Sequence, residues 1–262
     1  MYPMAVANPE QTRTSEIFGQ RKMPPVGAEL TQKQKLACAF RILAKHGWTQ
    51  NLAGHITFVP DASGAMWANP WGKWWQEVTA SDLVLVSADG EVIEGKWDVT
   101  PAIFIHTEIH RQRPEARVAI HNHPVHATVH AGLGVLPLIT EQTGAMFAGD
   151  MAIFNEFTGG IDNPTAGQQM ADAVGDANAA LLVNHGALVM GATIEEAVYR
   201  AVSFERVCEI SYKTMLTGRE PVPMDPDPLT AMKAGFLDPP TIEFFWNGAV
   251  RQLLATEPEV LD

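Results

Sequence analysis

Two histidines, His121 and His123, stand two residues apart at the end of the apolar run Val118-Ala119-Ile120. Alternate side chains of an extended strand point to the same face, so both imidazoles should project together while Asn122 points away. Their spacing of about 6–7 Å along a strand lets both rings reach one metal ion with little backbone strain. A catalytic metal usually has three protein ligands and an open position, so a further ligand is needed.

His185 is the best candidate for the third ligand. It follows the apolar run Leu181-Leu182-Val183 within Asn184-His185-Gly186, where a second strand is expected to end in a polar turn. A His-x-His pair alone is as consistent with chance as with metal binding, but a histidine at another strand end favours a metal. The sequence therefore predicts one divalent ion bound by His121, His123 and His185. Its identity stays open, because imidazole accepts Zn, Mn, Fe and Co alike.

Several further motifs accompany these histidines, and together they resemble the class II aldolase/adducin family. That family carries His-x-His on one strand and Asn-His-Gly on a later one. The other matching motifs are Ala53-Gly54-His55-Ile56-Thr57, Asn69-Pro70-Trp71-Gly72, Val78-Thr79-Ala80-Ser81-Asp82-Leu83 and Arg113-Pro114-Glu115. The resemblance spans about residues 30–218. It implies a single-domain three-layer α/β/α sandwich around a mostly antiparallel sheet, and a homotetramer with pockets at subunit boundaries.

The chain departs from the family pattern where sugar-phosphate aldolases have a Ser-Ser-Glu-like run before His-x-His. Those serines help to hold phosphate and the glutamate is the acid/base. At the same spacing this sequence reads Thr100-Pro101-Ala102, and His55 replaces the asparagine usual after the glycine of the early turn. A phosphorylated sugar is therefore a poor candidate substrate. Decarboxylation tolerates the missing glutamate better than aldol cleavage, because it needs a carbanion sink and a late proton donor.

Three residues could replace the missing acid/base. His55 is placed near the pocket by the resemblance, and histidine titrates near neutral pH. His106 lies one helical turn after Ala102, whereas Glu108 lies nearly two turns on and is displaced around the axis. For each of them a structural role is at least as plausible as catalysis. The resemblance also implies that Gly54, Thr100 and Gln142 contribute to substrate binding.

These residues lead to a hypothesis about the reaction. A metal held by three neutral imidazoles keeps its full positive charge and can stabilise the enolate left when a C–C bond breaks. We expect a metal-dependent lyase acting by decarboxylation or retro-aldol cleavage on a non-phosphorylated hydroxy or aromatic acid, and hence a small anionic substrate. The alternatives are a non-heme iron oxygenase on the same fold and an adducin-like binding protein without catalysis.

Other histidines offer weaker alternatives. His106 and His110 lie at i and i+4 on one helical face and form a competing metal pair, but no third ligand is evident nearby. His126 and His130 repeat this spacing on the helix that begins at Pro124. Either could hydrogen-bond a metal ligand, although packing is the more plausible role of both.

The elements that must position these groups have clear boundaries. Thr31 predicts the start of a helix with Gln34 in the capping-box position, and Gly47 ends it. Further helices are expected from Thr100 to Pro114, over Pro164–Val174, and from Thr193 to Gly218. Residues 1–27 are expected to form an N-terminal arm, 28–220 the family domain, and 221–262 a tail packing on the domain or on a neighbouring subunit.

Composition limits the remaining classes of function. The chain has 262 residues with a formal charge of −12, which disfavours nucleic acid and anionic lipid as partners. It contains no run of 18 apolar residues and no signal core near its N-terminus, so a cytoplasmic location is expected. Cys38 and Cys208 are expected to be buried thiols. Four of the seven tryptophans fall between residues 66 and 75, where core or subunit interface is favoured over pocket lining.

Overall fold

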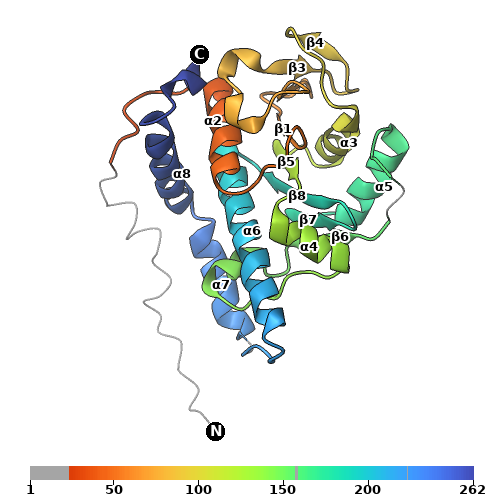
Figure 1. Ribbon diagram of the computed structural model, residues 1–262, viewed down its shortest axis with the longest axis vertical. Coiled ribbons are helices and arrows are strands. Elements are labelled where there is room, and N and C mark those ends of the chain that lie inside the picture. The colour runs from red at the N-terminus through yellow and green to blue at the C-terminus, as the bar shows by residue number, and fades with distance from the viewer. Residues whose placement is uncertain (1–23, 157–158, 223) are drawn as a thin grey trace.

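The computed structural model describes residues 24–156, 159–222 and 224–262 (Figure 1). Across these residues eight strands form one sheet in the order β4-β3-β2-β1-β5-β8-β7-β6. Neighbouring strands are antiparallel except β6 and β7, which are parallel. The strands are β1 (His55–Phe58), β2 (Met66–Ala68), β3 (Val84–Val86), β4 (Val92–Glu94), β5 (Val118–Asn122), β6 (Met151–Phe154), β7 (Ala179–Leu182) and β8 (Gly186–Gly191).

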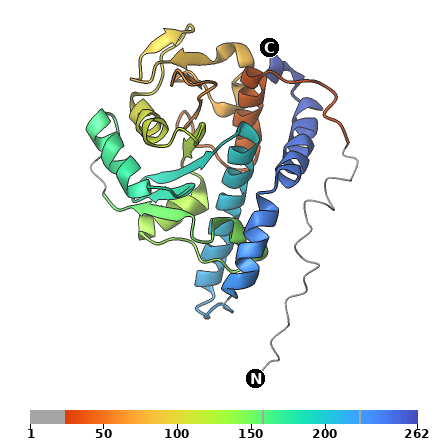
Figure 2. The same ribbon diagram turned by 180° about the vertical axis from the view of Figure 1, so that it is seen from behind.

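Helices cover both faces of this sheet (Figures 1 and 2). The α-helices are α2 (Gln32–Lys45), α3 (Phe104–Gln112), α4 (Val125–Leu133), α5 (Pro164–Val174), α6 (Ile194–Leu216), α7 (Pro226–Phe236) and α8 (Pro239–Leu254). Helices α2, α4, α6 and α8 share one hydrophobic core, and α3 and α5 share a second. A third, smaller core lies between β2, β3 and Ile103. The predicted three-layer sandwich around a mostly antiparallel sheet is confirmed.

The alternation of side chains along β5 decides which layer faces the candidate site. Val118 and Ile120 pack into the core beneath α2 and α6, whereas Ala119 packs into the core beneath α3 and α5. His121 therefore lies on the α3 side of the sheet. The same alternation on β1 places Ile56 on the α2 side. His55 and Thr57 therefore face α3.

The predicted helix boundaries agree closely with the structure. Thr31 caps α2 with a complete capping box that includes Gln34. Thr193 accepts a hydrogen bond from the backbone of Glu196 at the start of α6. Thr100 caps a short 3-10 helix, η4 (Pro101–Ile103), which leads directly into α3. These caps satisfy backbone N–H groups that a helix leaves free at its N-terminus.

The C-terminal segment packs on its own chain. Trp246, Val250 and Leu253 of α8 are buried in the core shared with α2 and α6. The buried guanidinium of Arg41 in α2 binds the carboxylates of Glu257 and Glu259, which follow α8 in the sequence. The N-terminal arm predicted over residues 1–27 lies largely outside the described residues.

Two smaller expectations concern the cysteines and the membrane. Cys38 and Cys208 are both buried and free, as predicted. Among the helices described, none combines the length and the apolar character that crossing a bilayer requires.

Candidate metal centre and its pocket

His121, His123 and His185 meet at one edge of the sheet. His121 lies near the end of β5, His123 directly follows that strand, and His185 lies in the turn between β7 and β8. Their ring centroids are 4.7–5.2 Å apart, and one nitrogen from each ring lies within 4.8 Å of the other two. The structure thus brings together the three residues that the sequence proposed as ligands.

Hydrogen bonds on the far side of two rings select the nitrogens that are free to bind a metal. Nδ1 of His121 donates to the carbonyl oxygen of Ala187 at 3.0 Å. Nδ1 of His123 is bound to Oε1 of Gln50. Each neutral ring therefore turns its Nε2 lone pair away from these acceptors, as metal-binding histidines usually do.

The donor set fits a divalent cation. Nε2 of His123 is buried and has no hydrogen-bond partner among the described residues. Burial lowers the pKa of His121 well below its usual value, and burial together with the neighbouring His185 lowers the pKa of His123 to about 4. The rings are thus neutral near pH 7, which is the form that binds metal.

Close packing explains why glycine stands at positions 54 and 186. A Cβ on Gly186 would lie 2.5 Å from Cδ2 of His123, so the ring can take its place only beside a glycine. A Cβ on Gly54 would lie 2.3 Å from Nδ2 of Asn122, and Gly54 also has a φ of +91°. The amide of Asn122 in turn donates to Trp48 and accepts from the backbone of His123. Each glycine allows close packing at the end of β5.

A cavity of about 190 Å³ opens beside the three rings. Its lining residues, all within the described part of the chain, are Leu52, Ala53, Gly54, His55, Asn69, Trp71, Thr100, Ala102, His121, His123 and His185. They include no carboxylate, lysine or arginine. Ala102 and Thr100 thus lie beside the metal cluster, as the spacing from His121 suggested.

The tryptophan cluster divides between pocket and core. Trp71 lines the cavity and is 59% exposed. Trp75 is buried and donates from Nε1 to the carbonyl oxygen of Gly54, which supports the turn at the cavity wall. Trp74 is exposed outside the cavity lining, and Trp67 is half-buried with the ammonium of Lys33 over its ring.

The candidate acid/base residues have different positions. His55 lies in the cavity wall, and its Nδ1 is 2.6 Å from Nε2 of His106, which is buried behind it. Both carboxylate oxygens of Glu108 accept from Arg111 at 2.8 Å. Glu108 is buried beside Gly167 of α5 and is not part of the cavity lining. Gln142 is exposed at the start of η5 (Gln142–Phe147) and is likewise outside this lining. Gly54, Thr100, His55 and, through His55, His106 are therefore the residues that this geometry brings to the site.

The competing histidine pair on α3 is occupied by hydrogen bonds. His106 Nδ1 and His110 Nε2 each lie 2.7 Å from Oγ1 of Thr57 on β1. No metal cluster that includes either ring is found among the described residues. His126 pairs with Glu205, and His130 Nδ1 contacts the carbonyl oxygen of Val135, so neither touches a metal ligand.

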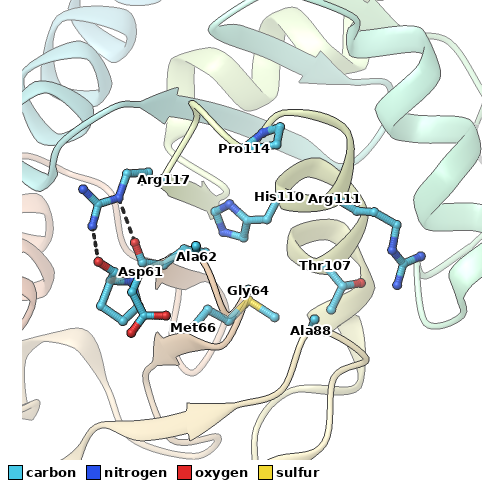
Figure 3. Close-up of a pocket in the computed structure, with 12 residues that line it drawn as sticks. Asp61, Ala62, Gly64, Met66, Ala88, Thr107, His110, Arg111, Pro114 and Arg117 are labelled. Carbon is cyan, nitrogen blue, oxygen red and sulfur yellow. Dashed lines mark hydrogen bonds between the residues drawn. The ribbon is translucent and has the colours of Figure 1, made fainter.

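A second and larger cavity lies on the other side of His110. It has a volume of about 520 Å³, and Figure 3 shows the His110 ring pointing into it, near Met66 and Pro114. Arg117 closes one wall by donating to the carbonyl oxygens of Val59 and Pro60. None of the three clustered histidines lines this cavity, so it is separate from the metal pocket.

Sequence reasoning missed Gln50 and Thr57. Gln50 gives no local signal, because it lies 73 positions before its partner His123 and reaches it only through the fold. Thr57 could have been found, since it shares a strand face with His55 and is polar where a core side chain is expected. Its position opposite the His106/His110 face required the packing of α3 on β1.

Comparisons with known proteins agree with this geometry. The profile of the "Class II Aldolase and Adducin N-terminal domain" family matches residues 34–212. Decarboxylase NovR of Streptomyces niveus is 32% identical over 209 residues, covering 78% of this chain and 77% of that protein. A 4-hydroxy-3-prenylphenylpyruvate oxygenase/4-hydroxy-3-prenylbenzoate synthase of Streptomyces roseochromogenus subsp. oscitans is also 32% identical over 209 residues, covering 78% and 75%.

Among solved structures, the L-fuculose 1-phosphate aldolase from Glaciozyma antarctica PI12 superposes with a TM-score of 0.77 at 28% identity. The match covers 95% of this chain and 99% of that one. The sheet, the histidine cluster and the profile match lead to one conclusion: the chain belongs to the class II aldolase/adducin family.

Proposed function

We propose that this protein is a metal-dependent lyase that cleaves a C–C bond of a non-phosphorylated hydroxy or aromatic acid, by decarboxylation or retro-aldol cleavage. The observation that carries this proposal is the combination of three converging neutral imidazoles with a cavity that no carboxylate of the described ranges lines. A divalent ion held by His121, His123 and His185 would supply a positive charge that stabilises an enolate.

The composition of the cavity supports a non-phosphorylated substrate. Phosphate groups in proteins are commonly held by arginine or lysine, and among the described residues neither lines this cavity. The chain instead offers the hydroxyl of Thr100 and the exposed ring of Trp71. An aromatic or short hydroxy acid could pack its apolar part on Trp71, with its polar end toward the histidines.

The experiment is product analysis in the absence of oxygen. The metal-loaded protein is incubated anaerobically with a panel of hydroxy, keto and aromatic acids, and released CO₂ and carbonyl products are measured. We expect turnover to CO₂ that is lost when the metal is removed. If turnover occurs only with Fe(II) and O₂, the protein is a non-heme iron oxygenase instead. That alternative is favoured by the relative whose name describes an oxygenase.

A non-catalytic, adducin-like role is the remaining alternative. A purely structural domain has no need of three neutral imidazoles placed within metal-binding distance. The discriminating measurement is elemental analysis of the purified protein, in which stoichiometric metal supports an enzyme. The absence of metal together with the absence of turnover would favour the binding role.

We also propose that the chain forms a homo-oligomer, with a tetramer as the family suggests. The C-terminal tail does not contribute to this proposal, because Trp246 is buried within its own chain. Exposed apolar side chains do support it, namely Val125 and Leu133 of α4 and the following Val135, Leu136 and Leu138. Light scattering at micromolar concentration should give a multiple of the chain mass, and Leu133→Glu should lower it whereas Leu133→Met should not. A fully active monomer would contradict the proposal.

A further inference from the structure

A continuous chain of hydrogen bonds begins at His55 in the wall of the metal pocket. His55 Nδ1 lies 2.6 Å from Nε2 of His106, and His106 Nδ1 lies 2.7 Å from Oγ1 of Thr57. The same hydroxyl lies 2.7 Å from Nε2 of His110, and His110 Nδ1 lies 2.8 Å from the carbonyl oxygen of Ala116. This chain of hydrogen bonds thus runs from β1 to α3, back to β1 and again to α3.

The carbonyl of Ala116 sets the direction of every donor in this chain. A carbonyl oxygen only accepts, so His110 carries its proton on Nδ1, and its Nε2 accepts from Thr57. The Thr57 oxygen then accepts from Nδ1 of His106, and Nε2 of His106 accepts from Nδ1 of His55. Four contacts require four hydrogens, which three neutral rings and one hydroxyl supply without surplus. His55 is left with a lone pair on Nε2.

We propose that Thr57, His106 and His110 are positioning residues that hold His55 in its Nδ1–H tautomer, so that its Nε2 is a proton acceptor for the metal pocket. The tautomer is a property of this hydrogen-bonded chain alone. Its use by a substrate rests on the proposed lyase function.

The reversed arrangement is disfavoured by the surroundings. If His55 carried its proton on Nε2, the neutral rings would pass their hydrogens in the opposite direction, and His110 would turn a lone pair toward Ala116. Two acceptors would then face each other at 2.8 Å and one hydrogen bond would be lost. Thr57 and His106 are fully buried, so bulk water does not compete for the hydrogen bond between them. Burial also lowers the pKa of His110 to about 4, which agrees with a neutral ring.

This tautomer defines what His55 can do in the reaction. Both kinds of C–C cleavage end with a carbanion that must receive a proton at carbon. A ring with a lone pair on Nε2 has to accept a proton before it can give one. In retro-aldol cleavage the substrate hydroxyl supplies that proton as its C=O bond forms, and the electron pair of the broken C–C bond remains on the other fragment. In decarboxylation water supplies the proton, and the electron pair stays on the fragment that loses CO₂.

Neutron diffraction of the zinc-loaded protein tests the assignment, because it locates deuterons on ring nitrogens. In the wild type we expect deuterons on Nδ1 of His55, His106 and His110. The Thr57→Val variant removes the hydroxyl at nearly constant volume, so His106 loses its acceptor. It should move its proton to Nε2, which faces His55, and the His55 proton should move to Nε2 as well. Thr57→Ser keeps the hydroxyl and should leave all three tautomers unchanged.

Kinetics on the same variants add a second readout. Thr57→Val should lower kcat about 10²-fold without changing bound metal, while Thr57→Ser stays within a few-fold of wild type. A wild-type deuteron on Nε2 of His55 would overturn the proposal, as would an unchanged His55 tautomer in Thr57→Val. The deuteron positions decide this even if no substrate is turned over, so failure of the lyase proposal is distinguishable from failure of this one.

Discussion

His55 and His121 face each other directly on adjacent antiparallel strands, with ring centroids 5.0 Å apart. They nevertheless have different partners. His121 joins the cluster with His123 and His185, whereas Nδ1 of His55 is bound to His106 on the neighbouring helix. Strand pairing thus places His55, which is not part of the ligand cluster, beside His121, which is. The contact that each ring makes outside this strand pair determines its role.

The metal cluster gives the first prediction. His123→Ala should abolish both bound metal and activity, because two remaining imidazoles leave the ion without its third protein ligand. His110→Ala should leave the metal content near normal, since His110 is hydrogen-bonded outside the cluster. Elemental analysis of both purified variants checks this. Stoichiometric metal in the His123 variant would place the site elsewhere.

Packing around Gly54 gives the second prediction. Gly54→Ala introduces a methyl group 2.3 Å from the Asn122 amide at a φ of +91°. Gly72→Ala has the same backbone cost at a φ of +93°, but its Cβ would meet nothing within 4 Å. The free energy of unfolding should fall by about 1–2 kcal/mol in Gly72→Ala, and overpacking should lower it by about 1–3 kcal/mol more in Gly54→Ala. Urea titrations measure both, and equal losses would show that the end of β5 can relax.

Features that depend on residues close together in the sequence could be predicted from it, whereas features that depend on contacts between distant segments could not. Caps such as Thr31 and Thr193 depend on neighbours three residues away, so their patterns are visible in the chain itself. The ligand cluster was visible because strand ends carry a recognisable motif. Gln50 reaches His123 only through the fold, and no local pattern specifies it. Thr57 shares a strand face with His55, but its contacts with His106 and His110 depend on the packing of α3 on β1. Glu108 illustrates the same limit, because packing of α3 turns its carboxylate to Arg111 and away from the cavity.

Trp71 gives the third prediction, which concerns substrate specificity. Its exposed ring lines the metal pocket, while Trp74 is similarly exposed but outside that lining. If the substrate is aromatic, Trp71→Ala should raise KM up to about tenfold through loss of a ring contact. Trp74→Ala is the matched control and should leave KM unchanged. Equal effects of the two variants on KM would argue against a substrate contact at Trp71.

The buried ring of His110 gives the fourth prediction. Its folded pKa of about 4 lies below the usual value of 6.5, so between these pH values the unfolded chain binds a proton that the folded protein does not. The contribution of this ring to the free energy of unfolding is therefore complete above about pH 6.5. It falls by on the order of 3 kcal/mol as the pH drops toward 4. His110→Gln should flatten the decline. Urea midpoints from pH 7 to pH 4, in EDTA for both proteins, measure it, and parallel curves would contradict the assignment.

The last prediction concerns the reaction and rests on Ala102, which lines the cavity beside the histidine cluster. A general acid/base contributes about 10²–10⁴-fold in rate, so an aldolase without its carboxylate is slow unless another group replaces it. Ala102→Glu should raise aldol cleavage if the protein is an aldolase in which that group is missing. In a decarboxylase the new anion should repel the substrate carboxylate and lower turnover. We expect the second result, with CO₂ released anaerobically by the wild type. Ala102→Gln is the matched control, because it fills the same volume without charge and separates repulsion from crowding.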